Sequence, residues 1–321
     1  MCTAITYQTK NFYFGRTLDH DRTYGEEVTV VPRQFPLPYV NSEHYAIIGM
    51  AHVADGFPLL YDAVNEKGLA MAGLNFVGNA HFGDTIPGKE NIPSFAFIPW
   101  ILAQCESVDQ ARLLLEGVNI TSEAFRPKYT PAQLHWILAD CKEAITIEST
   151  LDGINIYQNT PGVLTNNPPF NKQMFHLNNF MNLTPKSPKN RFSLRLELDA
   201  YSNGMGAIGL PGDLSSQSRF VRAAFTKLNS VSGSDEEESI TQFFHILETV
   251  SQTQGCCQLP DGGYEKTVYT SCCNCDKGIY YYTTYENRQI TAVDMHREML
   301  DSDTLSRYPL VQKQQISWQN R

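Results

Sequence analysis

Two strand-pair patterns lie at opposite ends of this chain, and they constrain its fold more than any other feature. Near the N-terminus the strand-like runs are Ala4–Tyr7 and Phe12–Arg16. Near the C-terminus they are Thr267–Cys275 and Ile279–Tyr285. Strands at both ends with helical stretches between them predict layered α and β structure, formed by one domain that spans residues 1–321.

The segment between the two hairpins alternates strand-like and helical patterns. Further strands are expected at Glu27–Val31, Tyr45–Met50, Leu69–Phe76, Leu134–Leu138, Ala144–Glu148, Ile154–Tyr157, Gly162–Thr165 and Gln289–Asp294. Helices are expected at Pro93–Cys105 (interrupted by Pro99), Ser107–Leu115, Asn171–Asn182, Phe192–Leu198, Gln217–Leu228 and Ser234–Val250. Asn203–Asp213 has four glycines and a proline, which predicts a loop.

Composition limits what the chain can bind and where it works. Its 321 residues are 42% hydrophobic, enough for a large core, and its net charge of -9 argues against a nucleic-acid partner. The sequence has no apolar run of membrane-spanning length and no signal-peptide pattern at its start, so we expect a cytoplasmic protein without a membrane partner. In that compartment its eight cysteines should be thiols. No pattern calls for a cofactor.

Position two is the most informative single position. A small residue there permits removal of Met1, which leaves Cys2 with a free α-amine. An α-amine has a reference pKa of about 8, so one residue can supply both a nucleophilic thiol and an adjacent base. Position alone does not require this, because a cysteine can also be an ordinary second residue.

The first hairpin places two charged residues near Cys2. If Lys10–Asn11 is a two-residue turn, paired residue numbers sum to 21, which sets Asp19 opposite Cys2 and Arg16 opposite Ile5. Asp19 could then bind the amine, and Arg16 could stabilise the thiolate, which is the reactive form of cysteine. A salt bridge at a strand end is the alternative interpretation of this pair.

An ordered set of short motifs covers nearly the whole chain. The motifs are MCT at 1–3, FGRTLD at 14–19, NEKGLAMAGLNF at 65–76, GVLTN at 162–166, GLPGD at 209–213, SRFVRAAF at 218–225, YTSC at 269–272 and TYEN at 284–287. In this order they resemble the choloylglycine hydrolase family, which includes bile salt hydrolases and penicillin V acylases. The resemblance implies an α+β fold, the four-layer αββα sandwich of the N-terminal nucleophile hydrolases, assembled as a homotetramer.

The resemblance also implies roles for individual residues. It implies a catalytic set in which Cys2 is the nucleophile, its amine is the general base, Arg16 and Asp19 support thiol and amine, Asn75 and Asn166 position substrate and stabilise the oxyanion, and Arg219 completes the site. It places an apolar acyl pocket near Leu18, Tyr24, Phe57, Phe125 and Tyr129, for which core packing is the alternative role.

Three functions remain open, two within the family and one from another class of protein. The first is hydrolysis of glycine- or taurine-conjugated bile salts, which the GLNF, GLPGD and SRFVRAAF matches favour. The second is a penicillin V acylase or another N-acyl amide hydrolase, with acyl transfer to an amine as a side reaction. The third is a catalytically silent thiol or zinc-binding protein.

The cysteines do not form the pattern of a zinc site. Adjacent Cys256 and Cys257 supply no second C-x-x-C pair beside Cys272 and Cys275, so we expect no metal. His135 is expected to be a core residue with satisfied hydrogen bonds.

Overall fold

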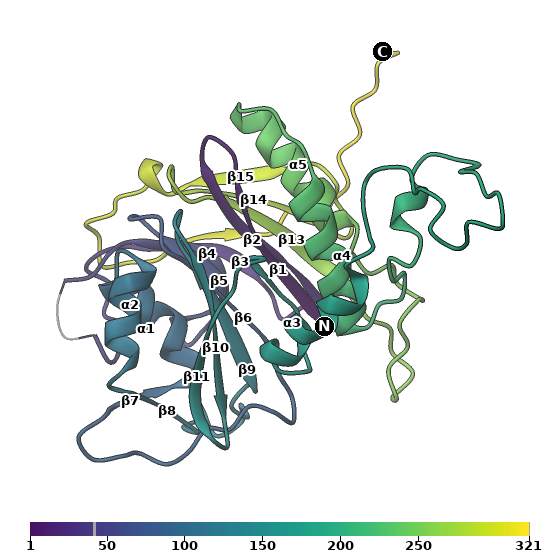
Figure 1. Cartoon of the computed structure of the whole chain (residues 1–321). Helices are drawn as coiled ribbons and strands as arrows, with labels where there is room; N and C mark the ends of the chain where they lie inside the picture. Colours follow the sequence, from purple (N-terminus) through teal and green to yellow (C-terminus); the bar gives the residue numbers. More distant parts are fainter. Residues whose placement is uncertain (41–42, 321) are drawn as a thin grey trace.

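A computed structural model of the chain describes residues 1–40 and 43–320. Two antiparallel sheets form its centre (Figure 1). The six-stranded sheet has the order β12-β1-β2-β13-β14-β15, and its strands are Cys2–Gln8 (β1), Phe12–His20 (β2), Val163–Leu164 (β12), Lys266–Asn274 (β13), Ile279–Thr284 (β14) and Thr291–Asp294 (β15).

The eight-stranded sheet has the order β11-β10-β9-β6-β5-β4-β3-β16. Its strands are Glu27–Val31 (β3), Ile47–Ala54 (β4), Phe57–Asn65 (β5), Ala70–Asn75 (β6), Leu134–Ala139 (β9), Ala144–Thr150 (β10), Gly153–Gln158 (β11) and Ser306–Pro309 (β16). Glu90–Pro93 (β7) and Val118–Thr121 (β8) form a separate parallel pair.

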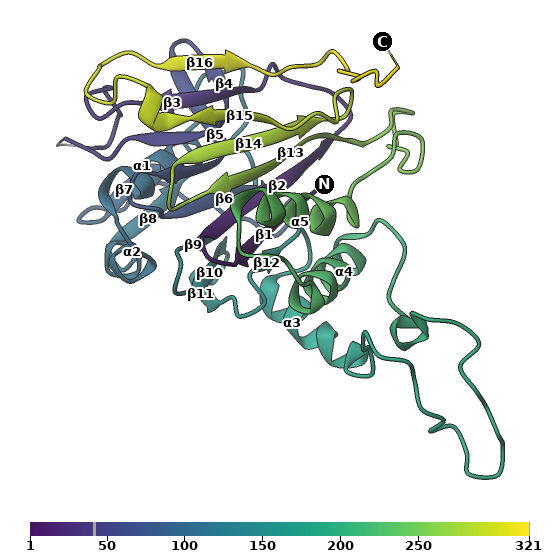
Figure 2. The same ribbon diagram turned by 90° about the horizontal axis from the view of Figure 1, so that it is seen from above.

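Helices cover the outer face of each sheet, so the four layers are αββα, as the resemblance implied (Figures 1 and 2). The α-helices are Phe97–Gln104 (α1), Val108–Leu115 (α2), Phe170–Leu177 (α3), Ser216–Asn229 (α4) and Glu236–Glu248 (α5). Short 3₁₀ turns lie at Ser94–Ala96, Asn178–Phe180, Met205–Ala207 and Met295–Arg297.

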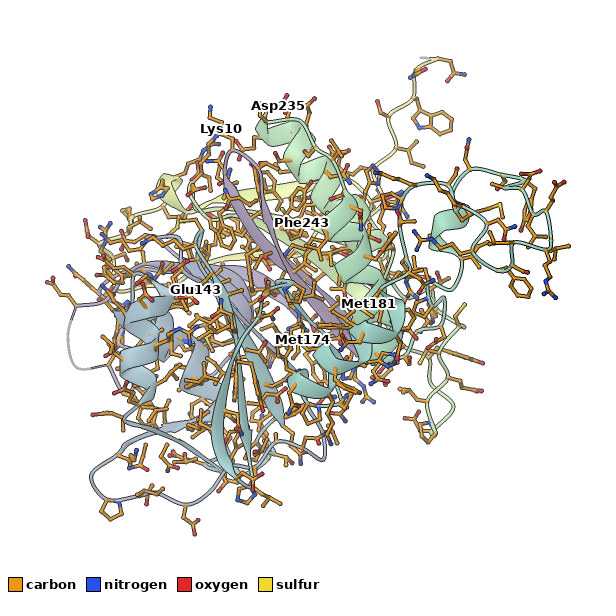
Figure 3. All side chains as sticks on the ribbon, in the orientation of Figure 1. Lys10, Glu143, Met174, Met181, Asp235 and Phe243 are labelled. Carbon is orange, nitrogen blue, oxygen red and sulfur yellow. The ribbon has the colours of Figure 1, made fainter. Side chains whose placement is uncertain are left out.

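Two hydrophobic cores hold these layers together. One lies around the six-stranded sheet and between the sheets, and the other joins α1 and α2 to the outer face of the eight-stranded sheet. Successive side chains of a strand point to opposite faces of its sheet, so neighbours in β4 belong to different cores: Ile48 to the first and Ile47 to the second. In Figure 3, Phe243 of α5 lies over the β1–β2 hairpin, and its ring meets that of Tyr7 edge to face at 6.5 Å. Every residue of β1 except Gln8 is buried.

Most of the expected elements are present. The C-terminal hairpin is confirmed, and Ser107 caps α2 by accepting a hydrogen bond from Gln110 N at 3.3 Å. The cap of α5 is Asp235, one residue after the predicted Ser234. Pro99 does not interrupt α1, because it lies in the first turn, where its missing N–H has no partner to lose.

The predicted helix at Phe192–Leu198 is wrong. The segment belongs to a loop that projects from the body of the molecule (Figure 2), and all four of its apolar side chains are exposed. Phe192, Leu194, Leu196 and Leu198 recur at every second position, a spacing that no single helix face can bury together. Strand β5 was missed because Pro58 and Asp62 interrupt its apolar pattern.

The predicted register of the first hairpin is also wrong. The strands end at Gln8 and Phe12, and three residues connect them, so paired numbers sum to 20. A main-chain hydrogen bond from Thr9 N to Asn11 O, 3.0 Å long, closes this connection. Cys2 therefore opposes Leu18. Because side chains alternate between faces, this one-residue change moves every β2 side chain to the other face relative to β1.

Candidate active site

Cys2 is the first residue of β1, next to the N-terminus marked in Figure 1, and it is buried. Its main-chain nitrogen donates a hydrogen bond to Asn166 Oδ1 at 2.9 Å. The ammonium of Met1 lies further out, where it donates to Asp19 O at 2.7 Å and to Glu265 Oε1 at 3.1 Å. Removal of Met1 would convert the nitrogen at Asn166 into the α-amine.

Arg16 shares the face of the hairpin on which the Cys2 side chain lies. It opposes Ala4, the next residue on that face of β1. The guanidinium is buried and crosses to the eight-stranded sheet, where Nη1 donates to Gly73 O at 2.6 Å and to Tyr61 O at 3.3 Å. Burial opposes the charge of Arg16, but the negative charge of a Cys2 thiolate raises its pKa, and the net pKa is above the usual value. The cation is thus available to stabilise a thiolate.

Asp19 lies on the opposite face from the Cys2 side chain, which corrects the predicted pairing. Its buried carboxylate accepts hydrogen bonds from Thr267 Oγ1 at 2.6 Å and Thr17 Oγ1 at 3.1 Å. Burial raises the pKa of Asp19, while Arg219 and the N-terminal ammonium oppose the rise. Asp19 is therefore close to the ammonium of Met1 and to Arg219, and it does not face the Cys2 thiol.

Arg219, on α4, joins the helical layer to the start of β1. The wholly buried guanidinium donates through Nη1 to Cys2 O and to Thr3 Oγ1 (2.8 Å), and through Nη2 to Asn166 Oδ1 (2.7 Å). Its Nε donates to Leu214 O at 2.9 Å. Burial lowers the pKa of Arg219, although the negative charges of Asp19 and Cys2 oppose this. One side chain thus holds both Cys2 and Asn166 in place.

Asn75 ends β6 and meets Asn166 through its main chain. Asn166 Nδ2 donates to Asn75 O at 2.9 Å, and the Asn75 side chain is exposed. Asn166 Oδ1 accepts from both Cys2 N and Arg219, so the orientation of its amide is fixed. Hydrogen bonds thus join Cys2, Asn75, Asn166 and Arg219. Arg16 and Asp19 are placed near Cys2 by the register of the hairpin, on opposite faces of it.

The five predicted pocket residues lie in three groups. Phe57, Phe125 and Tyr129 form one aromatic cluster, with ring centroids 5.5 Å apart for the first two and 6.0 Å for the last two. Leu18 is buried directly opposite Cys2 in the hairpin. Tyr24 is about half exposed, and its ring packs against His20 at 5.1 Å.

Several residues at the site were not predicted from sequence. Tyr61 lies near Arg16 and Cys2, and burial raises its pKa well above the usual value. Gln173, fully buried on α3, donates to Asn166 O at 2.6 Å, and Ser216 Oγ accepts from Asn166 N at 2.8 Å. No spacing rule connects these side chains to Cys2, because each comes from a distant segment.

The other thiols and histidines have ordinary surroundings. His135 is buried, with its ring nitrogens 3.0 Å from Glu148 Oε1 and 2.9 Å from Thr165 O, which confirms the predicted satisfied core residue. Cys272, Cys273 and Cys275 are buried, whereas Cys256 is exposed. Across residues 1–40 and 43–320, no group of three or more His, Cys, Asp or Glu side chains is arranged to hold a metal ion.

The four-layer fold with a cysteine at the start of a central strand is that of the N-terminal nucleophile hydrolases. The chain belongs to the choloylglycine hydrolase family of linear amide C–N hydrolases, whose family model matches residues 2–308. The solved structure of a mutant conjugated bile acid hydrolase from Clostridium perfringens has a TM-score of 0.92 and 34% identity, covering 100% of both chains. The penicillin V acylase from Agrobacterium tumefaciens, at 21% identity and a TM-score of 0.73, shares the fold. The match covers 95% of this chain and 90% of the acylase chain.

Relatives in sequence extend over almost the full chain. A bile salt hydrolase/transferase from Lactiplantibacillus plantarum is 50% identical over 314 residues, which cover 97% of each chain. A bile salt hydrolase/transferase from Clostridium perfringens is 35% identical over 317 residues, or 96% of each chain.

Proposed function

We propose that this chain hydrolyses the amide bond of glycine- and taurine-conjugated bile salts, with Cys2 as the nucleophile after removal of Met1. The main support for the reaction is the position of the Cys2 nitrogen. It donates a hydrogen bond to Asn166 Oδ1 and lies close to the buried Arg16 and Arg219. The bile salt hydrolase/transferase names of the relatives at 50% and 35% identity support the substrate class. The aromatic cluster of Phe57, Phe125 and Tyr129 offers apolar surface for a steroid acyl group.

The proposed reaction has two steps. In the first, the α-amine accepts the Cys2 thiol proton as Sγ attacks the amide carbon, and the carbonyl oxygen becomes an oxyanion near Asn75 and Asn166. The C–N bond then breaks, the ammonium protonates the leaving nitrogen, and a thioester remains on Sγ. In the second, water gives a proton to the amine and attacks the thioester, which releases the bile acid and restores the thiol.

Two further features complete the proposal. The whole chain would act as one catalytic domain in the cytoplasm and assemble as a homotetramer. The projecting loop with its exposed Phe192 and Leu194 supports assembly, because burial against another copy would remove this apolar surface from water. Among the described residues, no helix combines the length and apolar character needed to cross a bilayer.

The substrate is tested by incubating the enzyme, under reducing conditions, with glycocholate, taurocholate or penicillin V. The products measured are glycine or taurine from the bile salts and the side-chain acid from penicillin V. We expect rapid release of glycine or taurine, and slower or no release from penicillin V. A separate incubation with added free amine would reveal acyl transfer. Release from penicillin V alone would move the chain to the acylase branch, and no release from any of the three, with Met1 shown by mass spectrometry to be absent, would contradict the proposed substrate.

Arg219→Ala is expected to reduce kcat/KM by about 10²-fold or more, because the nucleophile residue and Asn166 lose a common anchor. It should also lower the free energy of unfolding by about 2–4 kcal/mol, since buried acceptors lose their donor. Arg219→Lys is the matched control: it retains the charge but not the forked geometry, and we expect it to recover stability more than activity. Unchanged kinetics in Arg219→Ala would remove this residue from the site.

A further inference from the structure

Asp62 is a buried carboxylate that lies between the two sheets, unlike Asp19, and close to the candidate site. Asp62, on β5, accepts hydrogen bonds from Tyr269 OH at 2.6 Å, Tyr280 OH at 2.5 Å and Ser271 Oγ at 2.9 Å, and it is 1% exposed. An ionised carboxylate only accepts hydrogen bonds, so three converging hydroxyl donors match the charged form. Burial raises the pKa of Asp62, and Arg16 and the three hydroxyls oppose this rise.

Arg16 crosses the space between the sheets in the opposite direction. It starts on the six-stranded sheet and binds main-chain oxygens of Tyr61 and Gly73 on the eight-stranded sheet. Asp62 follows Tyr61 in β5 and pairs with Ala72, the residue before Gly73. The carbonyl groups hold the guanidinium but cannot neutralise it. A buried cation without a nearby negative charge is strongly destabilising, so the nearby carboxylate has a clear electrostatic function.

Ser271 connects the main chain of Arg16 to the carboxylate of Asp62. Its Oγ accepts a hydrogen bond from Arg16 N at 3.1 Å and donates to Asp62 Oδ2 at 2.9 Å. The other titratable groups close to Asp62 are Tyr269, Tyr280 and Cys273, and burial raises the pKa of each well above its usual value. They therefore remain neutral, which leaves Arg16 as the charged side chain that acts on Asp62.

We propose that Asp62 is a positioning residue that acts through Arg16: its carboxylate balances the buried guanidinium and thereby sets how strongly that cation stabilises the Cys2 thiolate. The proposal rests on the proposed function, because the thiol concerned is the proposed nucleophile. Two carboxylates, Asp19 and Asp62, then match two buried cations, Arg16 and Arg219, around the start of β1.

Asp62→Asn tests this in the processed enzyme. The variant keeps the side-chain volume and removes the charge, while Arg16 retains its main-chain acceptors. The readout is the rate at which iodoacetamide alkylates Cys2 as a function of pH, followed by mass spectrometry of the N-terminal peptide. We expect the midpoint of this profile to move about one pH unit lower, since removing a nearby negative charge favours the thiolate.

Tyr280→Phe is the matched control. It removes one hydrogen bond from the same cluster but leaves the carboxylate, so we expect lower stability with an almost unmoved alkylation profile. An unmoved profile in Asp62→Asn would overturn the inference. Equal shifts in both variants would also overturn it, because they would indicate packing rather than charge.

A double variant covers the case in which Asp62→Asn does not fold. Combining it with Arg16→Met removes both charges, so neither is buried alone, and folded protein should be recovered. Failure to recover folding would contradict the charge balance. The alkylation readout needs no amide substrate, so inactivity of the wild-type enzyme on bile salts would count against the proposed function and leave this inference to be judged by the profile.

Discussion

Cys2→Ser is expected to reduce kcat/KM on conjugated bile salts by at least about 10³-fold, because the hydroxyl is a far weaker nucleophile beside an amine base. The fold should persist. Sulfur and oxygen differ little in size, and the main-chain contacts of residue 2 with Asn166 and Arg219 do not involve the side chain. Steady-state kinetics and a thermal unfolding curve on the same preparation measure both quantities.

Cys257→Ser is the sharpest control for this prediction. Cys257 is a half-buried thiol within electrostatic range of the N-terminus and Arg219, but burial and the nearby Glu265 raise its pKa and disfavour the reactive thiolate. We expect its replacement to leave turnover nearly unchanged. Full turnover in Cys2→Ser together with its loss in Cys257→Ser would transfer the nucleophile to Cys257.

An alanine inserted between Met1 and Cys2 is expected to lower kcat/KM by about 10²–10⁴-fold, the usual contribution of a general base. Initiator methionine is removed before alanine, so Cys2 would keep its thiol, but its nitrogen would remain an amide that cannot accept a proton. Stability should change little, since the fold already accommodates a residue before Cys2: the Met1 ammonium is bound by Asp19 O and Glu265. Turnover with mass spectrometry of the intact N-terminus measures this effect.

The matched control is the same insertion in the Cys2→Ser variant, where no further loss should occur because thiol and amine act as one unit. Removing the added alanine with an aminopeptidase should restore activity to the Cys2 enzyme. Full turnover by protein whose alanine is shown to be intact would exclude the α-amine as the base.

Local sequence patterns predicted much of the fold for a physical reason. Strand and helix signals such as the β13–β14 hairpin and the Ser107 cap depend on neighbouring residues, and the structure contains them as expected. The failure at Phe192–Leu198 has an equally physical cause. Its alternating apolar residues have no inner surface to cover within one chain, so local pattern alone could not determine its conformation.

The candidate catalytic residues could be predicted from the sequence, but their arrangement could not. Position two suggested Cys2 as the nucleophile without any structure, and the ordered motifs predicted the same role for it together with Arg16, Asp19, Asn75, Asn166 and Arg219. The hairpin register was wrong by one residue, because a three-residue connection and a two-residue turn share the same local composition. That single residue decides whether Arg16 or Asp19 shares a face with the thiol.

The sequence by itself predicted the reactive residue, the order of most elements and the family to which the chain belongs. Only the tertiary structure decided which charged and polar side chains surround Cys2 and Asn166, since Asp62, Gln173 and Ser216 come from β5, α3 and α4. Their contacts arise from the packing of two sheets and two helical layers, and packing between distant segments leaves no periodic trace in the chain. An aspartate inside an apolar strand, as in LLYDAVN at 59–65, was the one local sign of this buried charge network.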